Sequence, residues 1–393
     1  MARSHAPAFL VLVGLALPAV AAAQATEPSA REQAVAIARA NPIQGAAAIE
    51  LFVGGLRHPW CLAFTPDGDI LVTEKYHGLR VIRDGRMLPD PLAGTPPGVF
   101  AKADSGLLDI ALDPDFTTNR LVYLSFVEGD ETANRTAIWR ARYQNGRLAD
   151  GRVIFRVVPD KAGPGHPGGR MLFLPDQTLL LTVGDGFEYK TAAQDLGSHL
   201  GKILRFTRDG RAAANNPFIS RADARPEIWS YGHRNPQGLA RDAETGELWA
   251  HEHGPRGGDE INRLRAGANY GWPAVTHGID YDGTVISERA FAPDVERSSF
   301  FWAPSIAPSG LAVYRGEAFA GWKGHLLVGG LVSHSLSRLS WREKPSFFVE
   351  EERLFGTLGQ RIRDVRVGPD GFVYLLTDED DAAIWRLRPA APK

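Results

Sequence analysis

The feature that most constrains the fold of this 393-residue chain is a pair of apolar runs that recurs six times. In each copy a turn, often Pro-Asp, separates the two runs, and the second run is rich in β-branched and apolar residues, as in a β-hairpin. The paired runs are 60–64 with 70–73, 107–112 with 121–124, 170–174 with 179–183, 238–240 with 248–250, 310–314 with 326–328, and 363–367 with 372–376. A hairpin repeated in this way is typical of a propeller. We therefore predict an all-β, six-bladed β-propeller, and favour it over a pair of β-sandwiches, which would have no reason to repeat the hairpin.

The N-terminal segment of the chain suggests how it is processed. Arg3, an apolar run at 9–17 and the small residues Ala21 to Ala23 follow one another as in a secretory signal, which we assign to 1–23. The apolar run is too short for a comfortable membrane span. We expect a short N-terminal extension with a weakly helical pattern at 24–47 and the propeller at 48–388. The mature protein is thus expected to be periplasmic or secreted, with no stable membrane insertion.

Charge and cysteine content exclude several classes of protein. The formal net charge is −2 and no long basic run is present, so nucleic acid is not an expected partner. Cys61 is the single cysteine, which excludes an intrachain disulfide and a thiolate metal cluster. It lies in an apolar run, and we expect it to be a buried packing residue.

The densest group of polar residues lies in glycine- and proline-rich loops between 230 and 273. Loop carbonyls together with Asp259 and Glu260 suit a cation that prefers oxygen ligands, such as Ca²⁺. The alternative is that both acids are solvated turn residues. His251 and His253 suggest zinc less strongly, because no third ligand is apparent nearby.

Two further groups of residues point to chemistry at the open end of the propeller. His166 lies in a Gly-Pro loop before the third hairpin, where it can act as a general base, and Asp185 follows that hairpin and could orient it. The alternative is a histidine that only satisfies loop backbone. Arg361 and Arg363 alternate on a strand and so share a face, which suits a multiply carboxylated or phosphorylated ligand. The alternative there is a solvated strand face, or pairing with Asp364 or Asp378.

Several longer motifs resemble those of a known family. They are Gly106-Leu107-Leu108-Asp109 with Asp113-Pro114-Asp115-Phe116, His166 with Gly169-Arg170, 200–205, 232–239, Gly254-Pro255 with 259–262, 269–273, and 361–364. Together they resemble the soluble quinoprotein glucose/sorbosone dehydrogenases, most closely the bacterial aldose sugar dehydrogenases that use pyrroloquinoline quinone (PQQ). The resemblance spans 51–387 and implies the same six-bladed propeller. No dinucleotide-binding glycine loop or Gly-x-Ser-x-Gly elbow is present.

The resemblance implies a reaction and a role for each matching residue. An aldose would be oxidised to a lactone by hydride transfer to the quinone, and a quinone or small redox protein would accept the electrons. For catalysis it implies His166 as base and Asp185 as its orienting acid, with Arg234 and Asn235 as quinone contacts and Arg234 beside the reacting carbonyl. For metal it implies Gly254 and Pro255 as carbonyl ligands of the Ca²⁺ that binds PQQ, and Glu260 and Tyr270 as ligands of a second Ca²⁺. For the cofactor it implies Arg361 and Arg363 as partners of PQQ carboxylates, and Tyr281 and Trp302 as packing residues.

The chain departs from the family pattern at three places. Ala103-Asp104-Ser105 stands where the family commonly has a glutamine, and Val332-Ser333-His334 stands where it commonly has a cofactor-binding lysine. The stretch around Trp302 aligns only with a shift. These departures motivate one alternative, a non-catalytic propeller that binds carbohydrate or a protein partner. A Ca²⁺-dependent hydrolase or lactonase is a further alternative, which the central histidine and arginine residues disfavour.

Overall fold

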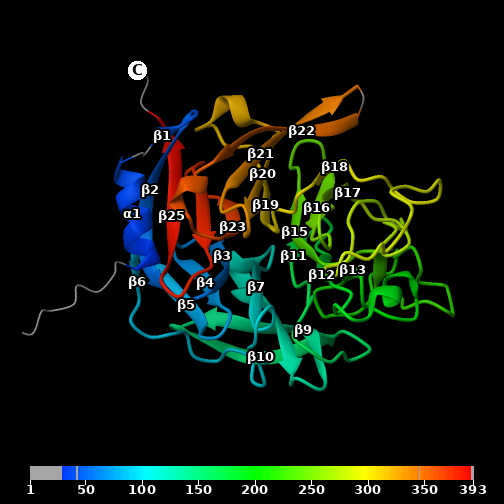
Figure 1. The fold of residues 1–393 in the computed structure, drawn as a ribbon. Helices are drawn as coiled ribbons and strands as arrows, with labels where there is room; N and C mark the ends of the chain where they lie inside the picture. Colours follow the sequence, from blue (N-terminus) through cyan, green and yellow to red (C-terminus); the bar gives the residue numbers. More distant parts are fainter. Residues whose placement is uncertain (1–28, 41–42, 345, 391–393) are drawn as a thin grey trace, which may run out of the picture.

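The strands of the chain form six separate sheets around a common centre (Figure 1). The structure is a computed structural model that describes residues 29–40, 43–344 and 346–390, so the expected signal segment lies outside the described residues. Five sheets have four strands and one has five. Both runs of every predicted hairpin fall on the first two strands of a sheet. The structure thus confirms the six-bladed β-propeller.

Each blade is a meander of antiparallel strands, and we number the blades by the order of their first strands. Blade 1 contains β3 (Pro59–Phe64), β4 (Ile70–Glu74), β5 (Gly78–Arg83) and β6 (Arg86–Met87), and blade 2 contains β7 (Leu107–Leu112), β8 (Leu121–Gly129), β9 (Asn134–Gln144) and β10 (Arg147–Arg156). Blade 3 contains β11 (Met171–Phe173), β12 (Leu179–Val183), β13 (Lys202–Phe206) and β14 (Ile228–Tyr231), and blade 4 contains β15 (Pro236–Arg241), β16 (Leu248–Glu252), β17 (Asp259–Arg263) and β18 (Phe300–Trp302). Blade 5 contains β19 (Pro308–Val313), β20 (Leu326–Gly330), β21 (Leu336–Glu343) and β22 (Ser346–Leu354).

Blade 6 is built from both ends of the chain. It contains β23 (Ile362–Val367), β24 (Val373–Thr377), β25 (Ala382–Pro389), β2 (Ala47–Leu56) and β1 (Ile43–Gln44). The blue strand β2 therefore lies beside the red strand β25 in Figure 1, with Ile49 opposite Leu387. The inner strands follow one another around the ring, and β23 packs against β3, so pairing of β2 with β25 closes the propeller.

Few helices accompany the blades. They are α1 (Ala30–Ala40), the short α2 (Phe116–Asn119), and the single-turn segments η1 (Lys190–Gln194), η2 (Ala320–Trp322) and η3 (Gly356–Leu358). Helix α1 packs on η3 beside blade 6 and buries Ala34 and Ala38. In the part of the chain that the structure describes, no helix has the length and apolar character needed to cross a membrane.

The core lies between neighbouring blades, because each sheet buries apolar residues on both faces. Trp60 and Trp385 are almost fully buried, and Cys61 on β3 is fully buried, as predicted for a packing residue. Burial also raises the pKa of the Cys61 thiol well above its usual value, which keeps it protonated.

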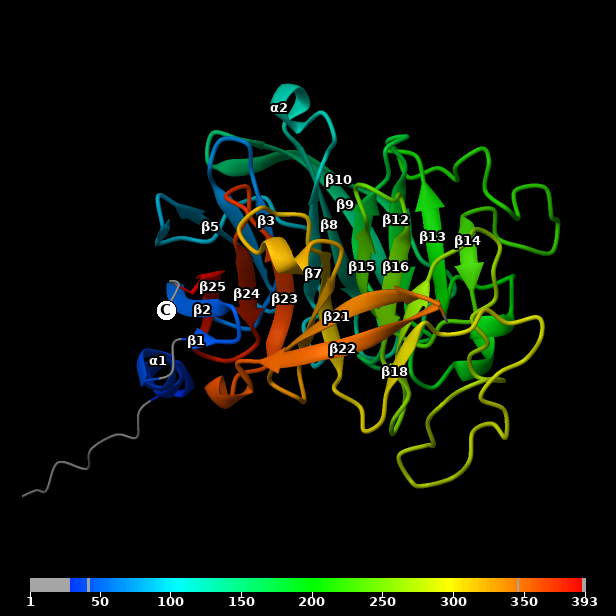
Figure 2. The same ribbon diagram turned by 90° about the horizontal axis from the view of Figure 1, so that it is seen from above.

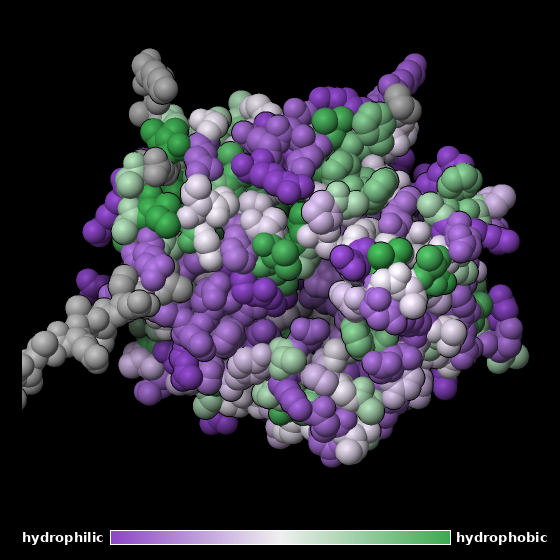
Figure 3. All heavy atoms as spheres, in the orientation of Figure 1, coloured by the Kyte–Doolittle hydropathy of each residue, from purple (hydrophilic) through white to green (hydrophobic). Residues whose placement is uncertain are grey.

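The topology gathers polar residues at one end of the propeller. Each first strand starts at this end and each second strand returns to it, so residues just before a first strand and just after a second strand meet there. Figure 2 shows α2 at the opposite end and the long loop before β18 at this one. The face seen in Figure 3 is hollowed near its centre, and hydrophilic residues line the hollow.

Candidate active site

A histidine and an aspartate face each other at this end of blade 3. His166 precedes β11 and Asp185 follows β12, and the His166 Nδ1 and Asp185 Oδ1 atoms are 2.7 Å apart. The other oxygen of Asp185 accepts from the Trp272 indole N–H at 2.8 Å. Both predicted residues are therefore together. With Nδ1 occupied by the carboxylate, Nε2 of His166 is left to take a proton.

The surroundings hold His166 in an unusual conformation and keep it neutral. Its φ is +49°, in the left-handed region that non-glycine residues seldom adopt, and its side chain is buried. Phe187 packs against the imidazole with the ring centroids 4.9 Å apart. Burial lowers the pKa of His166, and the hydrogen bond to Asp185 offsets this in part. A neutral, fixed imidazole is suited to work as a general base.

Arg234 brings a positive charge next to this pair. Its guanidinium donates to the carbonyls of His253 at 3.1 Å and Gly254 at 2.7 Å, and lies over the Trp272 ring at 5.3 Å. Tyr281 places its hydroxyl 3.4 Å from the same guanidinium. The Arg234 Nε–H is buried and has no protein partner in the described residues. A donor left in this state calls for an acceptor from a bound molecule.

Blade 4 fixes Arg234 and its neighbour through buried polar contacts. Glu252, at the end of β16, accepts from the Arg234 backbone N–H at 2.5 Å and lies 2.9 Å from His233 Nδ1. Asn235 accepts from the Gly168 N–H at 3.3 Å and from the Gln237 amide at 3.1 Å, which ties blade 4 to the loop of His166. The predicted quinone contacts thus lie beside the predicted base.

The loop predicted to bind Ca²⁺ is held by Asp259, an acid that the sequence suggests as a ligand. The Asp259 carboxylate accepts from the backbone N–H groups of Gly254, Ile306 and Ala307 at 2.7–2.8 Å. The carbonyl of Gly254 faces the Arg234 cation, and the carbonyl of Pro255 accepts from the Ser305 hydroxyl at 3.4 Å. Asp259 therefore anchors the loop, while these carbonyls face polar groups.

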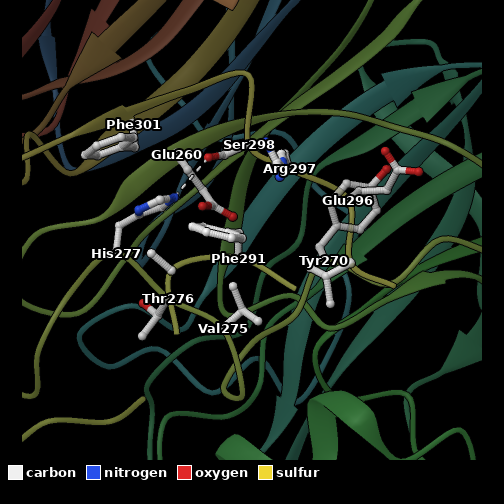
Figure 4. Close-up of a pocket in the computed structure, with 12 residues that line it drawn as sticks. Glu260, Tyr270, Val275, Thr276, His277, Phe291, Glu296, Arg297, Ser298 and Phe301 are labelled. Carbon is white, nitrogen blue, oxygen red and sulfur yellow. Dashed lines mark hydrogen bonds between the residues drawn. The ribbon is translucent and has the colours of Figure 1, made fainter. Parts of the chain in front are cut away.

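Glu260 and Tyr270 line a separate cavity of about 170 Å³ under the long loop before β18 (Figure 4). Glu260 lies opposite Glu252 on neighbouring strands, and its hydrogen bond from Asn262 is 3.0 Å long. Burial, and then the charge of Glu252, raise the pKa of Glu260 to about 8. The Tyr270 ring stacks on His233 at 4.6 Å. Glu252 and Glu260 thus lie side by side, and no Lys or Arg of the described residues pairs with either, which favours a bound cation.

The predicted arginine pair lies on an irregular stretch of blade 6. Strand β23 begins at Ile362 and has a β-bulge at Arg363, so the strand alternation used to place both arginines on one face is wrong here. Arg361 is half-buried and donates to the Leu331 carbonyl at 3.3 Å. Arg363 is buried and pairs with Asp378 through Nε at 3.0 Å. The pairing with Asp378 weighed from the sequence is thus present.

Not every predicted residue joins the others. Trp302 is buried in the core between blades 4 and 5 and donates to Glu350 at 3.3 Å, and none of its described side-chain contacts is with another predicted site residue. His251 and His253 each meet a blade 5 carbonyl, of Gly310 at 3.1 Å and Pro308 at 2.9 Å. Across the described ranges no group of three or more His, Cys, Asp or Glu residues is arranged for a metal.

Sequence reasoning missed several residues that shape the site. Trp272 and Phe187 fix the His166–Asp185 pair, and Lys75 lies with His58 against Asp378. Lys75, His253 and Asp378 each come directly after the second strand of a blade. Their shared position after the second strand could have identified these residues from the sequence, because every residue at that position reaches the same end of the propeller.

The fold and site define a class of protein: a six-bladed propeller with a buried histidine–carboxylate pair and clustered cations at one end. The model of the Glucose / Sorbosone dehydrogenase family matches residues 56–386. The chain is 40% identical over 347 residues to aldose sugar dehydrogenase YliI of Escherichia coli, covering 87% of this chain and 92% of that protein. The chain therefore belongs to the glucose/sorbosone dehydrogenase family, which confirms the resemblance seen in the sequence.

Solved structures agree with this assignment. The apo form of the soluble aldose sugar dehydrogenase from Escherichia coli matches with a TM-score of 0.84 and 39% identity, covering 88% of this chain and all of that one. The PQQ-bound aldose sugar dehydrogenase from Streptomyces coelicolor matches with a TM-score of 0.70 and 29% identity, covering 88% and 99%. The similarity thus includes a relative with the quinone bound.

Proposed function

We propose that this protein is a PQQ- and Ca²⁺-dependent aldose dehydrogenase that oxidises the anomeric carbon of a sugar to a lactone. The observation that carries the proposal is the buried His166–Asp185 pair, 2.7 Å apart, beside the Arg234 guanidinium. Family membership supports it, because relatives are named aldose sugar dehydrogenases and one is described in its PQQ-bound form.

The residues present suit such a cofactor. The buried Arg234 Nε–H finds no acceptor among the described residues, and the carbonyls of Gly254 and Pro255 lie in a loop fixed by Asp259. In our proposal Arg234 and Asn235 contact the quinone, the two carbonyls bind its Ca²⁺, and Arg361 and Arg363 meet its carboxylates. Tyr281, which is exposed beside Arg234, packs against the cofactor in this proposal. The buried position of Trp302 gives no support to a packing role for that residue.

The chain's own residues account for the proton and for the charge. PQQ, when bound, supplies the acceptor for the hydride that leaves the anomeric carbon. His166 Nε2 removes the proton of the anomeric hydroxyl, and Asp185 holds the ring and stabilises the imidazolium that results. Arg234 supplies positive charge where negative charge develops, in a site whose donors are fixed in advance. Phe187 and Trp272 pack around the pair and limit the access of water.

Reconstitution tests the proposal. The apoprotein is incubated with PQQ and Ca²⁺, and reduction of an artificial dye is followed with a panel of aldoses. We expect dye reduction that needs both additions and falls roughly 10²–10⁴-fold in His166→Ala. Absence of dye reduction with every sugar would contradict the proposal and favour the non-catalytic propeller. Lactone hydrolysis without PQQ would favour the hydrolase.

Export of the protein from the cytoplasm is also part of the proposal. We infer that 1–23 is cleaved on export, so that the enzyme works in the periplasm or outside the cell and passes electrons to a quinone or a small redox protein. N-terminal sequencing of the protein from a periplasmic fraction tests this, and an intact Met1 in the cytoplasmic fraction alone would contradict it.

A further inference from the structure

The side chain of Lys75 lies at the cofactor end of the propeller. It follows β4 of blade 1 and so occupies the position that His253 has in blade 4 and Asp378 in blade 6. The Lys75 carbonyl accepts from the Leu107 N–H at 2.9 Å, and a Cβ on Gly106 would lie 2.4 Å from it, so the neighbouring blade fixes this turn closely. Lys75 itself is buried, with 6% of its surface exposed.

A short turn links Lys75 to the loop of His166. The hydroxyl of Tyr76 donates to the Ala103 carbonyl at 2.7 Å, and the hydroxyl of Ser105 donates to the Pro164 carbonyl at 2.8 Å. Asp104 lies between these two anchors. These two contacts connect the turn after Lys75 to the loop that carries His166.

Three basic side chains share one buried carboxylate next to Lys75. The Asp378 carboxylate lies 3.4 Å from Lys75 Nζ, pairs with Arg363 and lies 2.9 Å from His58 Nδ1. Asp104 is exposed, so solvent screens its charge. Burial lowers the pKa of Lys75, and the charge of Arg363 lowers it further. Cations crowded in this way are stabilised by a further anion.

The turn that follows β20 of blade 5 presents an uncharged side chain, Val332, next to the arginine pair. Val332 has 62% of its surface exposed and follows Leu331, whose carbonyl accepts from Arg361. Arg361 therefore borders the uncharged Val332 turn on one side, while Arg363 connects through Asp378 to Lys75 on the other. Blade 1 thus brings a cation, Lys75, beside Arg363, whereas the blade 5 turn brings none at Val332.

We propose that Lys75 binds a carboxylate of the quinone cofactor, together with Arg363. This inference rests on the proposed function. Asp378 is then a positioning residue, because it holds the Lys75 ammonium and the Arg363 guanidinium side by side. An ammonium and a guanidinium on one carboxylate-bearing ligand would both stabilise it and fix its orientation.

Direct titration of the apoprotein with PQQ in the presence of Ca²⁺, followed by quenching of tryptophan fluorescence, measures affinity without turnover. We expect Lys75→Met to raise the Kd about tenfold or more, and Lys75→Arg to stay within about threefold of wild type, because a charged hydrogen bond is lost only in the first. Adding Val332→Lys to Lys75→Met should restore much of the affinity. Lys323→Met, which removes an exposed lysine paired with Glu317, is the matched control.

The outcomes separate this inference from the proposed function. Unchanged affinity in Lys75→Met, with wild type binding PQQ, would overturn the inference alone. An equal loss of PQQ affinity in Lys75→Arg would show that the charge of residue 75 does not bind the cofactor. Absence of PQQ binding by wild type would overturn both proposals. Circular dichroism and the unfolding midpoint without cofactor check the fold, and Lys75→Gln serves as the neutral variant if Lys75→Met does not fold.

Discussion

His166 keeps its left-handed backbone because its neighbours leave it no alternative. A Cβ on Gly184 would lie 2.3 Å from the His166 carbonyl, so the chain passes too closely there for any other residue. A left-handed non-glycine residue costs roughly 1–2 kcal/mol. The surrounding contacts with Asp185 and Phe187 outweigh that cost and leave the imidazole in a single orientation, as a proton acceptor requires.

The pH dependence of turnover follows from this environment. Activity needs neutral His166, and burial lowers its pKa, so kcat/KM should stay level down to a pH below 6.5 and then fall. Asp185 raises the pKa of His166, so Asp185→Asn should move the acid limb to still lower pH. It should also lower the plateau roughly 10²–10⁴-fold, because the ring loses its orientation. A pH–rate profile of both proteins measures this, and a limb displaced to higher pH would contradict it.

The sequence predicted His166 and Asp185 because both lie beside the ends of recognisable strands. It did not predict Phe187 or Trp272 as their partners, since those contacts depend on loop paths far apart in the chain. Lys75 was missed because a lone lysine in a turn is usually solvated. Its burial becomes evident only when blades 1, 2 and 6 are assembled.

Among the elements, β16 and β17 place like charges side by side. Glu252 and Glu260 lie opposite each other, and the pKa of Glu260 is raised to about 8. Between about pH 4.5 and 8 the folded protein therefore keeps a proton that the unfolded chain releases, so its stability falls as pH rises. Calcium binding to the ionised pair would reverse this loss.

Thermal unfolding of wild type and Glu260→Gln tests the pair. In chelator the Tm of wild type should fall from pH 5 to pH 8, and that of Glu260→Gln should fall less. Saturating Ca²⁺ should raise the wild-type Tm at pH 8 by roughly 3–6 °C and have little effect on the variant. Glu317→Gln, at an exposed site, is the control. A Ca²⁺ effect of equal size in all three proteins would contradict a cation at Glu260.

The elements also show where a regular pattern misleads. The first two strands of each blade were predicted because their apolar runs repeat. The outer strands β18 and β22 were not predicted, because buried and exposed residues do not alternate regularly along them. The bulge at Arg363 breaks the alternation from which the arginine pair was inferred, and five of the six inner strands have such a shift in their pairing. Bulges at this end redirect side chains toward the site.

At the scale of the whole molecule, the ring depends on one pairing between the ends of the chain. Strand β2 joins β25 across more than 300 residues, as in the pair Ile49 and Leu387, and no hairpin pattern could predict it. Helix α1 packs on η3 and β2 but adds no strand to the ring. The closed ring brings blades 1 and 6 together, and with them Lys75, Arg363 and Asp378.

Two truncations test the closure. A chain that begins after Ala40 loses α1 and should still unfold cooperatively, at a somewhat lower temperature. A chain that begins after Leu56 also loses β2 and exposes the edge of β25, and it should give aggregated protein or no cooperative transition. Calorimetry compares the two, and a cooperative transition of wild-type size in the shorter chain would show that β2 is dispensable.

The measurement that tests the central claim most directly is a single turnover without any electron acceptor. Protein loaded with PQQ and Ca²⁺ is mixed anaerobically with an aldose, and the absorbance of the bound quinone is followed. The quinone should be reduced in one exponential phase, more slowly with a sugar deuterated at the anomeric carbon, and far more slowly in His166→Ala although PQQ is still bound. A quinone that binds and stays oxidised with every aldose, or is reduced equally fast in His166→Ala, would contradict the account.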